Sequence, residues 1–459
     1  MKEELTIKFN KSMKAYPTVY KLLGILFLVI CLLIPLEMIS SVLFERLSSR
    51  NQAIEDITSS WGKEQNIIGP ILVVPYRACH KVWKEEITNG KLEKREVAES
   101  FTANALFLPS ILNILGSINP NKLHRGIYEA VVYSGMIKIS GQFEKPNFEI
   151  FKVEEKNILW DDAFITLGVT DLRGTKGSIH IKWGEDRFMF VTGSKIDDLN
   201  SGIQAKIKGL NAVNQEIPFE IDLKLNGSKQ INFAPIGIQN NVKIVSPWTD
   251  PSFKGNFLPT ERKIAQTGFE AEWQISYYGR NYPQQWVDKS SELYFKNLNS
   301  SLFGVAFVSL IDSYRNIERS TKYGMLFITL IFTAFFLFEV LSPIRIHPFQ
   351  YTLIGTALCF FYLALLSLSE LLSFFISYIT ASFSVIILIS FYSFKILQTG
   401  FRTLIISSEL VAIYTFLYII LQMQDYSLLF GTIGLFITLS AVMYFTRNID
   451  WYKLDQEKV

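Results

Sequence analysis

Six long apolar runs constrain this chain more than any other feature of its sequence. One covers residues 22–44. The other five follow in the last third of the chain, at about residues 323–341, 351–368, 371–394, 403–421 and 428–445. Each run is long enough to cross the hydrocarbon layer of a membrane as a helix, which satisfies its own backbone there. A large soluble helical core would need polar residues at helical spacing, and these runs have almost none. We therefore expect a multi-pass α-helical membrane protein with six transmembrane helices.

The first run could also be the hydrophobic part of a cleaved signal peptide. Pro35 interrupts it after a stretch of signal-peptide length. However, the leader of 21 residues is long for a signal peptide, and no A-x-A-like cleavage site follows. Because the whole run can span the membrane, we favour an uncleaved anchor.

Lysine and arginine residues gather on one side of the expected spans. The leader contains five lysines, and later flanks on the same side add Arg345, Lys395, Arg402 and Arg447. The short loops on the other side, at 369–370 and 422–426, contain no lysine or arginine. Cytoplasmic flanks carry the excess of basic residues, so both termini are expected in the cytoplasm. The expected order is a cytoplasmic leader at 1–21, a first transmembrane helix at 22–44, an extracytoplasmic (periplasmic) domain at 45–321, a bundle of five transmembrane helices at 322–446 and a cytoplasmic tail at 447–459.

Between the first two spans, the hydrophobic spacing changes from helical to alternating. Candidate strands lie at 131–143, 177–183, 202–208, 219–233, 241–245 and 269–278, separated by glycine, asparagine and proline. This pattern predicts a large β-rich domain of the α+β class, built as a mainly antiparallel sheet or sandwich. Whether it forms one lobe or two stays open. Helical segments at 43–61 and 288–321 are expected to connect it to the membrane.

The charged residues, cysteines and histidines exclude several classes of function. A net charge of +3 is too small for a nucleic-acid-binding chain. Only Cys79 lies in the polar middle region, so no disulfide is expected within the domain. The four histidines show no metal-ligand spacing, and we expect neither a metal nor a cofactor. The H-E-x-x-H, G-x-S-x-G and phosphate-loop motifs are absent as well.

Four acidic residues lie in or beside the apolar runs, namely Glu37, Glu339, Glu370 and Asp425. Charge is costly in lipid, so each must lie at the interface, become protonated, pair with a cation or line a wet cavity. Glu37 is expected at appreciable depth and the other three beside span ends. We regard Glu37 and Glu339 as candidates for functional intramembrane carboxylates.

Three cations precede the second span. Arg315 and Arg319 share one face of a helix at i and i+4, and Lys322 follows three residues later. They could bind lipid phosphate or hold the helix at the headgroup layer, and interfacial anchoring is the commoner use of such residues.

Short motifs along most of the chain resemble those of the CreD family of bacterial inner-membrane proteins. The resemblance begins in residues 43–50, continues through the Thr-Asp-Leu-Arg-Gly of 170–174, and covers about residues 40–452 in order. The motif positions are Glu45, Arg46, Arg50, Trp61, Gly62, Gly69, Pro70, Pro75, Tyr76, Asp171, Arg173, Gly174, Pro251, Phe253, Gly255, Pro259, Lys322, Tyr323, His347, Pro348, Gln350, Tyr351 and Glu370.

The resemblance implies an inner-membrane protein that supports cell-envelope integrity and the stress response, with effects on colicin tolerance and β-lactam sensitivity. It implies no reaction and no catalytic residue. The glycines and prolines, Gly69–Pro70 and Gly255 among them, are typical of turns that specify a fold. Asp171 and Arg173 lie two residues apart, which favours a local ion pair over a binding site.

Three functions are open on this basis. We favour a non-enzymatic protein whose outer domain binds or senses an envelope component, or another envelope protein, while its helices anchor it in the lipid bilayer. A membrane conduit that uses the intramembrane carboxylates is the alternative, although no inverted repeat or paired broken helices support it. A hydrolase built on the S-x-x-K pattern of Ser60 and Lys63 is the least favoured, because the accompanying motifs are missing and Ser60 fits a helix cap. The sequence does not indicate an oligomeric state.

Overall fold

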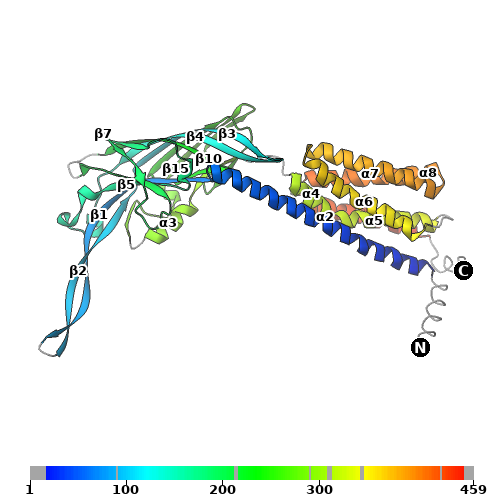
Figure 1. Ribbon diagram of the computed structural model, residues 1–459, viewed down its shortest axis with the longest axis horizontal. Coiled ribbons are helices and arrows are strands. Elements are labelled where there is room, and N and C mark those ends of the chain that lie inside the picture. Colours follow the sequence, from blue (N-terminus) through cyan, green and yellow to red (C-terminus); the bar gives the residue numbers. More distant parts are fainter. Residues whose placement is uncertain are drawn as a thin grey trace. The chain divides into compact units, whose positions relative to one another are not determined.

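The computed structural model describes residues 17–88, 91–210, 216–288, 291–307, 313–341, 346–423 and 426–448 of the chain. These residues form two compact units (Figure 1). The helical unit lies within Met1–Asn51 and Ile311–Val459, and the β unit is Gln52–Leu310.

The helices are α2 (Pro17–Trp61), α3 (Ser291–Ser300), α4 (Ser313–Lys322), α5 (Gly324–Leu341), α6 (Pro348–Ser369), α7 (Phe374–Leu397), α8 (Gly400–Gln422) and α9 (Ser427–Thr446). The strands are β1 (Gln65–Thr88), β2 (Lys91–Phe107), β3 (Ile111–Arg125), β4 (Tyr128–Phe143), β5 (Phe164–Val169), β6 (His180–Trp183), β7 (Asp186–Met189), β8 (Val191–Thr192), β9 (Gly202–Lys206), β10 (Ile217–Ser228), β11 (Gln230–Phe233), β12 (Gln239–Ser246), β13 (Pro251–Gly255), β14 (Glu261–Ala265), β15 (Gly268–Ser276), β16 (Gln285–Val287) and β17 (Phe303–Phe307).

Helix α2 buries one narrow stripe of its apolar surface. The buried side chains recur at alternating steps of four and three residues, which places them on a single seam of the helix. They are Ile25, Val29, Leu32, Leu36, Ile39 and Leu43. Leu28 and Leu33 beside this seam are partly buried, whereas others such as Phe27 and Ile34 are exposed, as expected of a helix whose remaining surface meets lipid.

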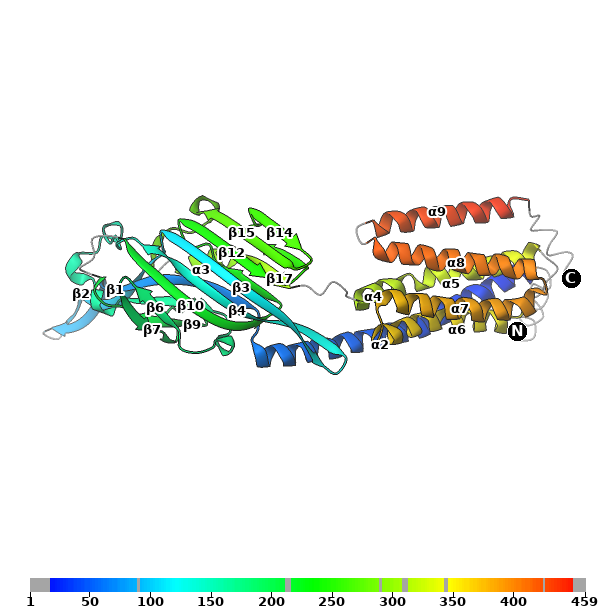
Figure 2. The ribbon, with the colours of Figure 1, turned by 90° about the horizontal axis from the view of Figure 1, so that it is seen from above.

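Helices α5 to α9 lie side by side (Figure 2). The seam of α2 packs into one hydrophobic core with side chains of α4, α5, α6, α7 and α8, while α9 adds none among the side chains that the structure describes. Four helices, α2, α6, α7 and α8, are each long and apolar enough to span a membrane. The pair α4 and α5, bent by 44°, would make a fifth span, and α9 holds a shorter apolar stretch. Several apolar spans are thus confirmed, whereas the total of six stays a prediction.

Two mixed sheets form the β unit. The first has the order β13-β17-β11-β1-β5-β9-β8, with β2 pairing β1 and β16, and the second has the order β14-β15-β12-β3-β4-β10-β6-β7. Most neighbours are antiparallel, but β1 runs parallel to β11 and β12 runs parallel to β3. The prediction of a large, β-rich and mainly antiparallel domain is confirmed, and the two parallel pairs make both of its sheets mixed.

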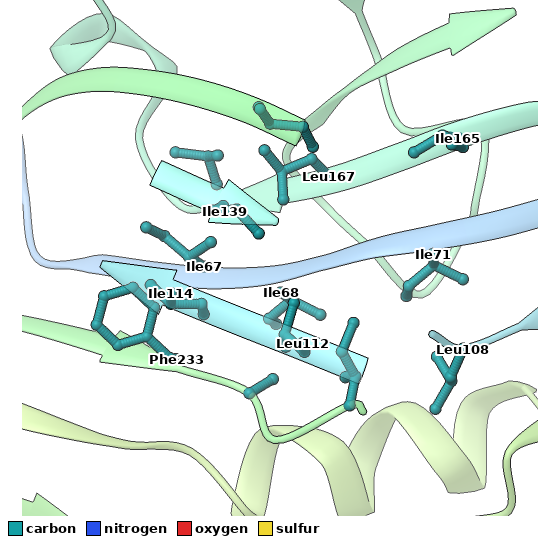
Figure 3. Packing of buried hydrophobic residues seen from close by; sticks show 14 of the residues in the cluster. Ile67, Ile68, Ile71, Leu108, Leu112, Ile114, Ile139, Ile165, Leu167 and Phe233 are labelled. Atoms are coloured by element: carbon teal, nitrogen blue, oxygen red, sulfur yellow. The ribbon is translucent and has the colours of Figure 1, made fainter. Parts of the chain in front are cut away.

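Side chains from both sheets pack into a single core, so the β unit is a sandwich. Figure 3 shows Ile67 and Ile71 of β1 in the same cluster as Leu112 of β3 and Leu167 of β5. The second sheet alternates between buried and exposed residues along β10 and β12, so one of its faces meets solvent. By contrast, β5 and β17 are buried at every position, which indicates cover on both faces.

The long β1–β2 hairpin extends past the rest of its sheet, as Figure 1 shows. Paired residues run from Leu72 opposite Phe107 to Thr88 opposite Lys91. The last contact of β1 with a neighbour other than β2 is the bridge from Tyr76 to Ile158, among the residues that the structure describes. From Arg77 onward the hairpin is therefore a two-stranded ribbon with both edges open.

Two local expectations are wrong. The segment 288–321 is not one helix, because the fully buried strand β17 separates α3 from α4. Gly69–Pro70 is not a turn between strands either, since it lies inside β1 with a cis peptide bond. The register between β1 and β5 shifts from Ile68 to Ile71. Gly69–Pro70 therefore lies where the backbone of β1 departs from regular pairing.

Candidate functional site

Several motif positions meet where α2 enters the β unit, in what we call the junction cluster (Trp61, Gly62, Lys63, Gln65, Asp171, Arg173, Gly174 and Asn226). Its centre is the buried carboxylate of Asp171. Arg173 donates to it through Nε at 2.9 Å and Nη2 at 2.8 Å, and the Lys63 amide donates at 3.0 Å. The Arg173 guanidinium, aided by the backbone amides of Lys63 and Arg173, holds the pKa of Asp171 below its ordinary value against the effect of burial. The predicted local ion pair is confirmed.

Gln65 joins this carboxylate segment to β10. Its amide nitrogen donates to the carbonyl oxygens of Asp171 and Asn226, each at 3.0 Å, and its oxygen accepts from the Asp171 amide at 3.2 Å. Gly62 and Gly174 lie against the same Asn226 carbonyl, where no side chain fits. These hydrogen bonds fix one arrangement of three chain segments, although the buried side-chain oxygen of Asn226 has no hydrogen-bond partner among the described residues.

Trp61, the last residue of α2, is tied to the same region. Its Nε1 donates to the Tyr133 carbonyl at 3.1 Å, and the buried Tyr133 hydroxyl donates to the Gln230 carbonyl at 3.0 Å. The ammonium group of Lys176 lies 5.8 Å from the centre of the Trp61 ring. Hydrogen bonds therefore fix the end of α2 to the sheet. The junction cluster connects chain segments and does not form a pocket.

A second cluster, the Lys21–Glu339 cluster (Lys21, Glu339, Ile346 and Tyr351), closes one end of the helical unit. Glu339 is only 4 % exposed and accepts hydrogen bonds from Lys21, from the Tyr351 hydroxyl at 3.3 Å and from the Ile346 amide at 3.3 Å. Lys21 also donates to the Ile346 carbonyl at 2.8 Å. One buried carboxylate thus connects α2, the end of α5 and the start of α6.

The His-Pro-Phe-Gln-Tyr motif begins α6. His347 Nδ1 accepts from the Phe349 amide at 3.2 Å, and the Gln350 side chain accepts from the His347 amide at 2.9 Å. This reciprocal arrangement is a capping box, and Pro348 takes the first helical position, where its missing amide costs nothing. Tyr351 then reaches Glu339, so the motif both starts the helix and completes the Lys21–Glu339 cluster.

A third cluster, the Arg46–Glu370 cluster (Arg46, Arg50, Tyr314 and Glu370), lies at the opposite end of α6. The Glu370 carboxylate is 3.5 Å from Arg46 and accepts from the Tyr314 hydroxyl at 3.5 Å. The Arg50 guanidinium lies 5.7 Å from the centre of the Tyr314 ring. These contacts join α2, α4 and α6.

Two cations of α4, Arg319 and Lys322, have partners within the helical unit. Arg319 donates to the carbonyl oxygens of Ile420 and Leu421 at the end of α8, at 3.2 and 3.1 Å. Lys322 pairs with Glu318 one turn earlier at 2.8 Å. A cation at a helix C-terminus stabilises the helix dipole, so Arg319 serves the bundle itself.

The intramembrane carboxylates differ from one another in their surroundings. Glu37 is exposed on α2, away from the buried seam, whereas Glu339 is buried and fully bonded. Asp425 lies outside the described residues. Glu409, which was not among the predicted carboxylates, is partly buried in the middle of α8 and has no hydrogen-bond or ion-pair partner among the described residues. The sequence does contain a sign of Glu409, because it is a lone acidic residue within an apolar run.

The other motif positions support the sandwich. The Phe253 ring on β13 contacts Phe269 and Trp273 edge-on, each at 5.8 Å between centroids. Gly255 ends β13 opposite Phe303. Tyr76 is buried and meets the Phe148 ring at 6.1 Å. The positions not yet placed are Glu45, exposed on α2; Pro75, inside β1; Pro251, which begins β13; Pro259, between β13 and β14; and Tyr323, between α4 and α5.

Ser60 does not form a site with Lys63. Its hydroxyl donates to the Asp56 carbonyl at 3.0 Å inside the last turn of α2, so the expectation that it caps the start of a helix is wrong. Within the described residues, no group of three histidine, cysteine or acidic side chains could hold a metal ion.

An open groove of about 1080 Å³ crosses the exposed face of the second sheet. We call it the basic groove, because its lining has six lysine or arginine residues against three acidic ones. Its cations are Lys138, Lys176, Lys182, Arg187, Lys224 and Lys243. The groove spans six neighbouring strands, β12, β3, β4, β10, β6 and β7. No motif position lies in it, so the sequence motifs do not indicate it.

Comparisons with known proteins agree with the sequence motifs. A family model described as "Inner membrane protein CreD" matches residues 17–452. The chain is 29% identical over 443 residues to the inner membrane protein CreD of Escherichia coli (strain K12), a match that covers 96% of each chain.

Proposed function

Because the chain belongs to the CreD family of inner-membrane proteins, we propose that it supports the integrity of the cell envelope by binding an envelope component in its β unit. The observation that carries this proposal is the basic groove, an open cavity on a sheet face that the sandwich core does not use. In this proposal the helices anchor the protein, and no catalytic step is involved.

The proposal includes an orientation, with both termini in the cytoplasm and the β unit in the periplasm. Its support is the concentration of lysine and arginine in the flanks on one side of the spans. This orientation presents the groove to the periplasmic side of the envelope, where lipid headgroups and envelope polymers are available.

A conduit is the second candidate, and Glu409 is the observation that favours it. An unpaired carboxylate within a membrane helix is costly unless it serves a purpose. Two residues earlier in α8, the Ser407 hydroxyl forms a 2.7 Å hydrogen bond with the Ser390 hydroxyl of α7, which adds a second polar feature to the same helix. Transport would then reside in the helical unit and not in the groove.

Complementation of a deletion strain separates the two candidates. The strain would be scored for detergent and β-lactam sensitivity with the full chain, with a chain truncated after Thr321, and with Glu409→Gln and Glu37→Gln in the full chain. Rescue by the truncated protein, at normal levels in the membrane, supports the binding function and contradicts the conduit.

The opposite complementation result would assign the activity to the helical unit. If only the full chain rescues, and Glu409→Gln abolishes rescue while the exposed Glu37→Gln does not, the conduit replaces our proposal. Because α2 packs its seam against the removed helices, the amount of truncated protein in the membrane must be measured in the same strains.

A further inference from the structure

We propose that the basic groove binds a phosphate-bearing amphiphile, with the anionic head on β10, β6 and β7 and the apolar chain along β4, β3 and β12. This inference rests on the proposed function, because it names the class of envelope component that the β unit binds. It is carried by the uneven distribution of charge and apolar surface along the groove.

Unpaired cations gather at one end of the groove. Lys182 on β6 lies directly opposite Arg187 on β7 in the strand register, and both are exposed. Like charges placed opposite each other on neighbouring strands destabilise a sheet. Glu220 faces Lys182 from β10, but its carboxylate bonds instead to Lys138 on the other side, at 2.7 Å. The pair Lys182 and Arg187 is thus left without an ion-pair partner among the described residues.

Two further cations, Lys176 and Lys224, line the same half of the groove, with Lys224 four residues beyond Glu220 along β10. The Lys176 amide donates to the Lys224 carbonyl at 2.9 Å, which brings these two residues together beside β10. Glu185, Glu220 and Asp222 are the acidic residues at the same end, and Glu220 is taken up by Lys138 of β4, so four cations face two further carboxylates there. The net positive charge and the separate amino and guanidinium donors suit a phosphate group, which carries up to two negative charges and accepts several hydrogen bonds.

The other end of the groove has a different character. Leu115 on β3, Met136 on β4 and Val245 on β12 line it, and they are 53%, 57% and 43% exposed. The cations among them are already paired, because Lys243 bonds to both Glu270 and Glu272, at 2.5 and 2.7 Å, and Lys138 to Glu220. This half therefore presents an exposed apolar strip, and the cations beside it are neutralised by their ion pairs.

The length of the groove is adequate for such a ligand. Six strands are separated by five steps of about 4.8 Å, so the groove crosses roughly 24 Å of sheet. A cationic end followed by an apolar strip complements an amphiphile, whereas inorganic phosphate or an acidic polymer would leave the apolar strip uncovered.

The test uses full-length protein in nanodiscs of phosphatidylcholine, with empty nanodiscs as the blank. Octyl phosphate is titrated as the probe, and inorganic phosphate and octyl glucoside supply the head or the chain alone. We expect octyl phosphate to bind more tightly than either comparison compound. A photoreactive group at the end of the octyl chain should label peptides from β3, β4 or β12.

The decisive variant carries Lys182→Gln, Arg187→Gln and Lys224→Gln. Its matched control carries Lys152→Gln, Lys208→Gln and Lys254→Gln, three exposed cations of the β unit outside the groove. The groove variant should bind octyl phosphate roughly tenfold more weakly or worse, since each charged hydrogen bond contributes appreciably. The control should change affinity by less than about twofold, because charges beyond a Debye length are screened. If the triple variant unfolds at a lower temperature, Arg187→Gln alone is measured.

Three results would overturn the inference: equal weakening in both triple variants, inorganic phosphate binding as tightly as octyl phosphate, or photolabelling outside the groove. Complete competition by polyglutamate that leaves the apolar strip unlabelled would assign the groove to an acidic polymer instead. Failure of the proposed function looks different, because octyl phosphate would bind in the groove while the groove variant still rescued the deletion strain.

Discussion

Lys21, in the first turns of α2, donates a hydrogen bond to the buried carboxylate of Glu339, which lies 318 residues later in the chain. One ion pair thereby joins the two sequence segments that make up the helical unit. Lys21 keeps about a quarter of its side chain exposed, whereas Glu339 is 4 % exposed, so the two partners lose unequal amounts of solvation.

Replacing Lys21 by Met should therefore lower the free energy of unfolding by about 3–5 kcal/mol, because a buried carboxylate would remain without its cation. Combining Lys21→Met with Glu339→Gln should recover part of the loss, since the charge is then removed as well. The measurement is chemical unfolding of the purified protein in mixed micelles. Lys322→Met, which breaks the exposed pair with Glu318, is the control and should cost less than about 1 kcal/mol. Equal losses for Lys21→Met and Lys322→Met would show that the buried pair has no special role.

Asp171→Asn should lower the free energy of unfolding by about 1–3 kcal/mol near neutral pH, because charged hydrogen bonds to Arg173 and Lys63 are weakened. Since the folded-state pKa of Asp171 lies below its ordinary value of 3.8, its contribution is complete above that value and is lost as the pH falls through the folded-state pKa. The difference between wild type and variant, followed by thermal unfolding, should therefore shrink in acid. A difference that stays constant down to the lowest pH measured would contradict the role of the charge.

Gly174→Ala should destabilise the junction cluster, because a Cβ atom there would overlap the Asn226 carbonyl oxygen, which is backbone and cannot move aside. We expect a loss of about 1–3 kcal/mol or more in the free energy of unfolding. Gly116→Ala is the control, since a Cβ on β3 would meet its neighbours only at 3.7 Å and beyond. Similar unfolding temperatures for the two variants would disprove the close packing.

Cys79 provides a direct check of the proposed orientation. It is exposed, whereas Cys359 is buried and Cys31 is partly buried in the helical unit. A membrane-impermeant maleimide should label the protein in cells whose inner membrane is intact, and Cys79→Ser should remove the label. Labelling that requires lysis of the inner membrane would place the β unit in the cytoplasm.

Local sequence patterns predicted much of this fold. The alternation at 131–143 and 269–278 identified β4 and β15, because one face of each strand is buried and the other exposed. Asp171 and Arg173 were recognised as a pair because they are two residues apart. In each case the information needed lies within a few residues of the chain.

Other features depend on residues that are distant in the sequence, so no local sequence pattern predicts them. Phe303–Phe307 is a short, wholly buried run, and such a run cannot be told from part of a helix by its period. No spacing in the sequence relates Lys21 to Glu339, since folding alone brings them together. The unpaired cations of the basic groove were equally hidden, because Lys182 and Arg187 meet only through the pairing of β6 with β7.

The β1–β2 ribbon implies that a single strand differs in local stability along its length. Residues Ile71–Val74 of β1 are held in the sandwich core, whereas from Arg77 to Thr88 the strand pairs only with β2, over roughly 40 Å of rise. A two-stranded hairpin without a core is marginal by itself, so its amide hydrogens should exchange with solvent through local opening long before those of the inner segment. The outer part of β1 can thus separate and re-form while the sandwich stays folded.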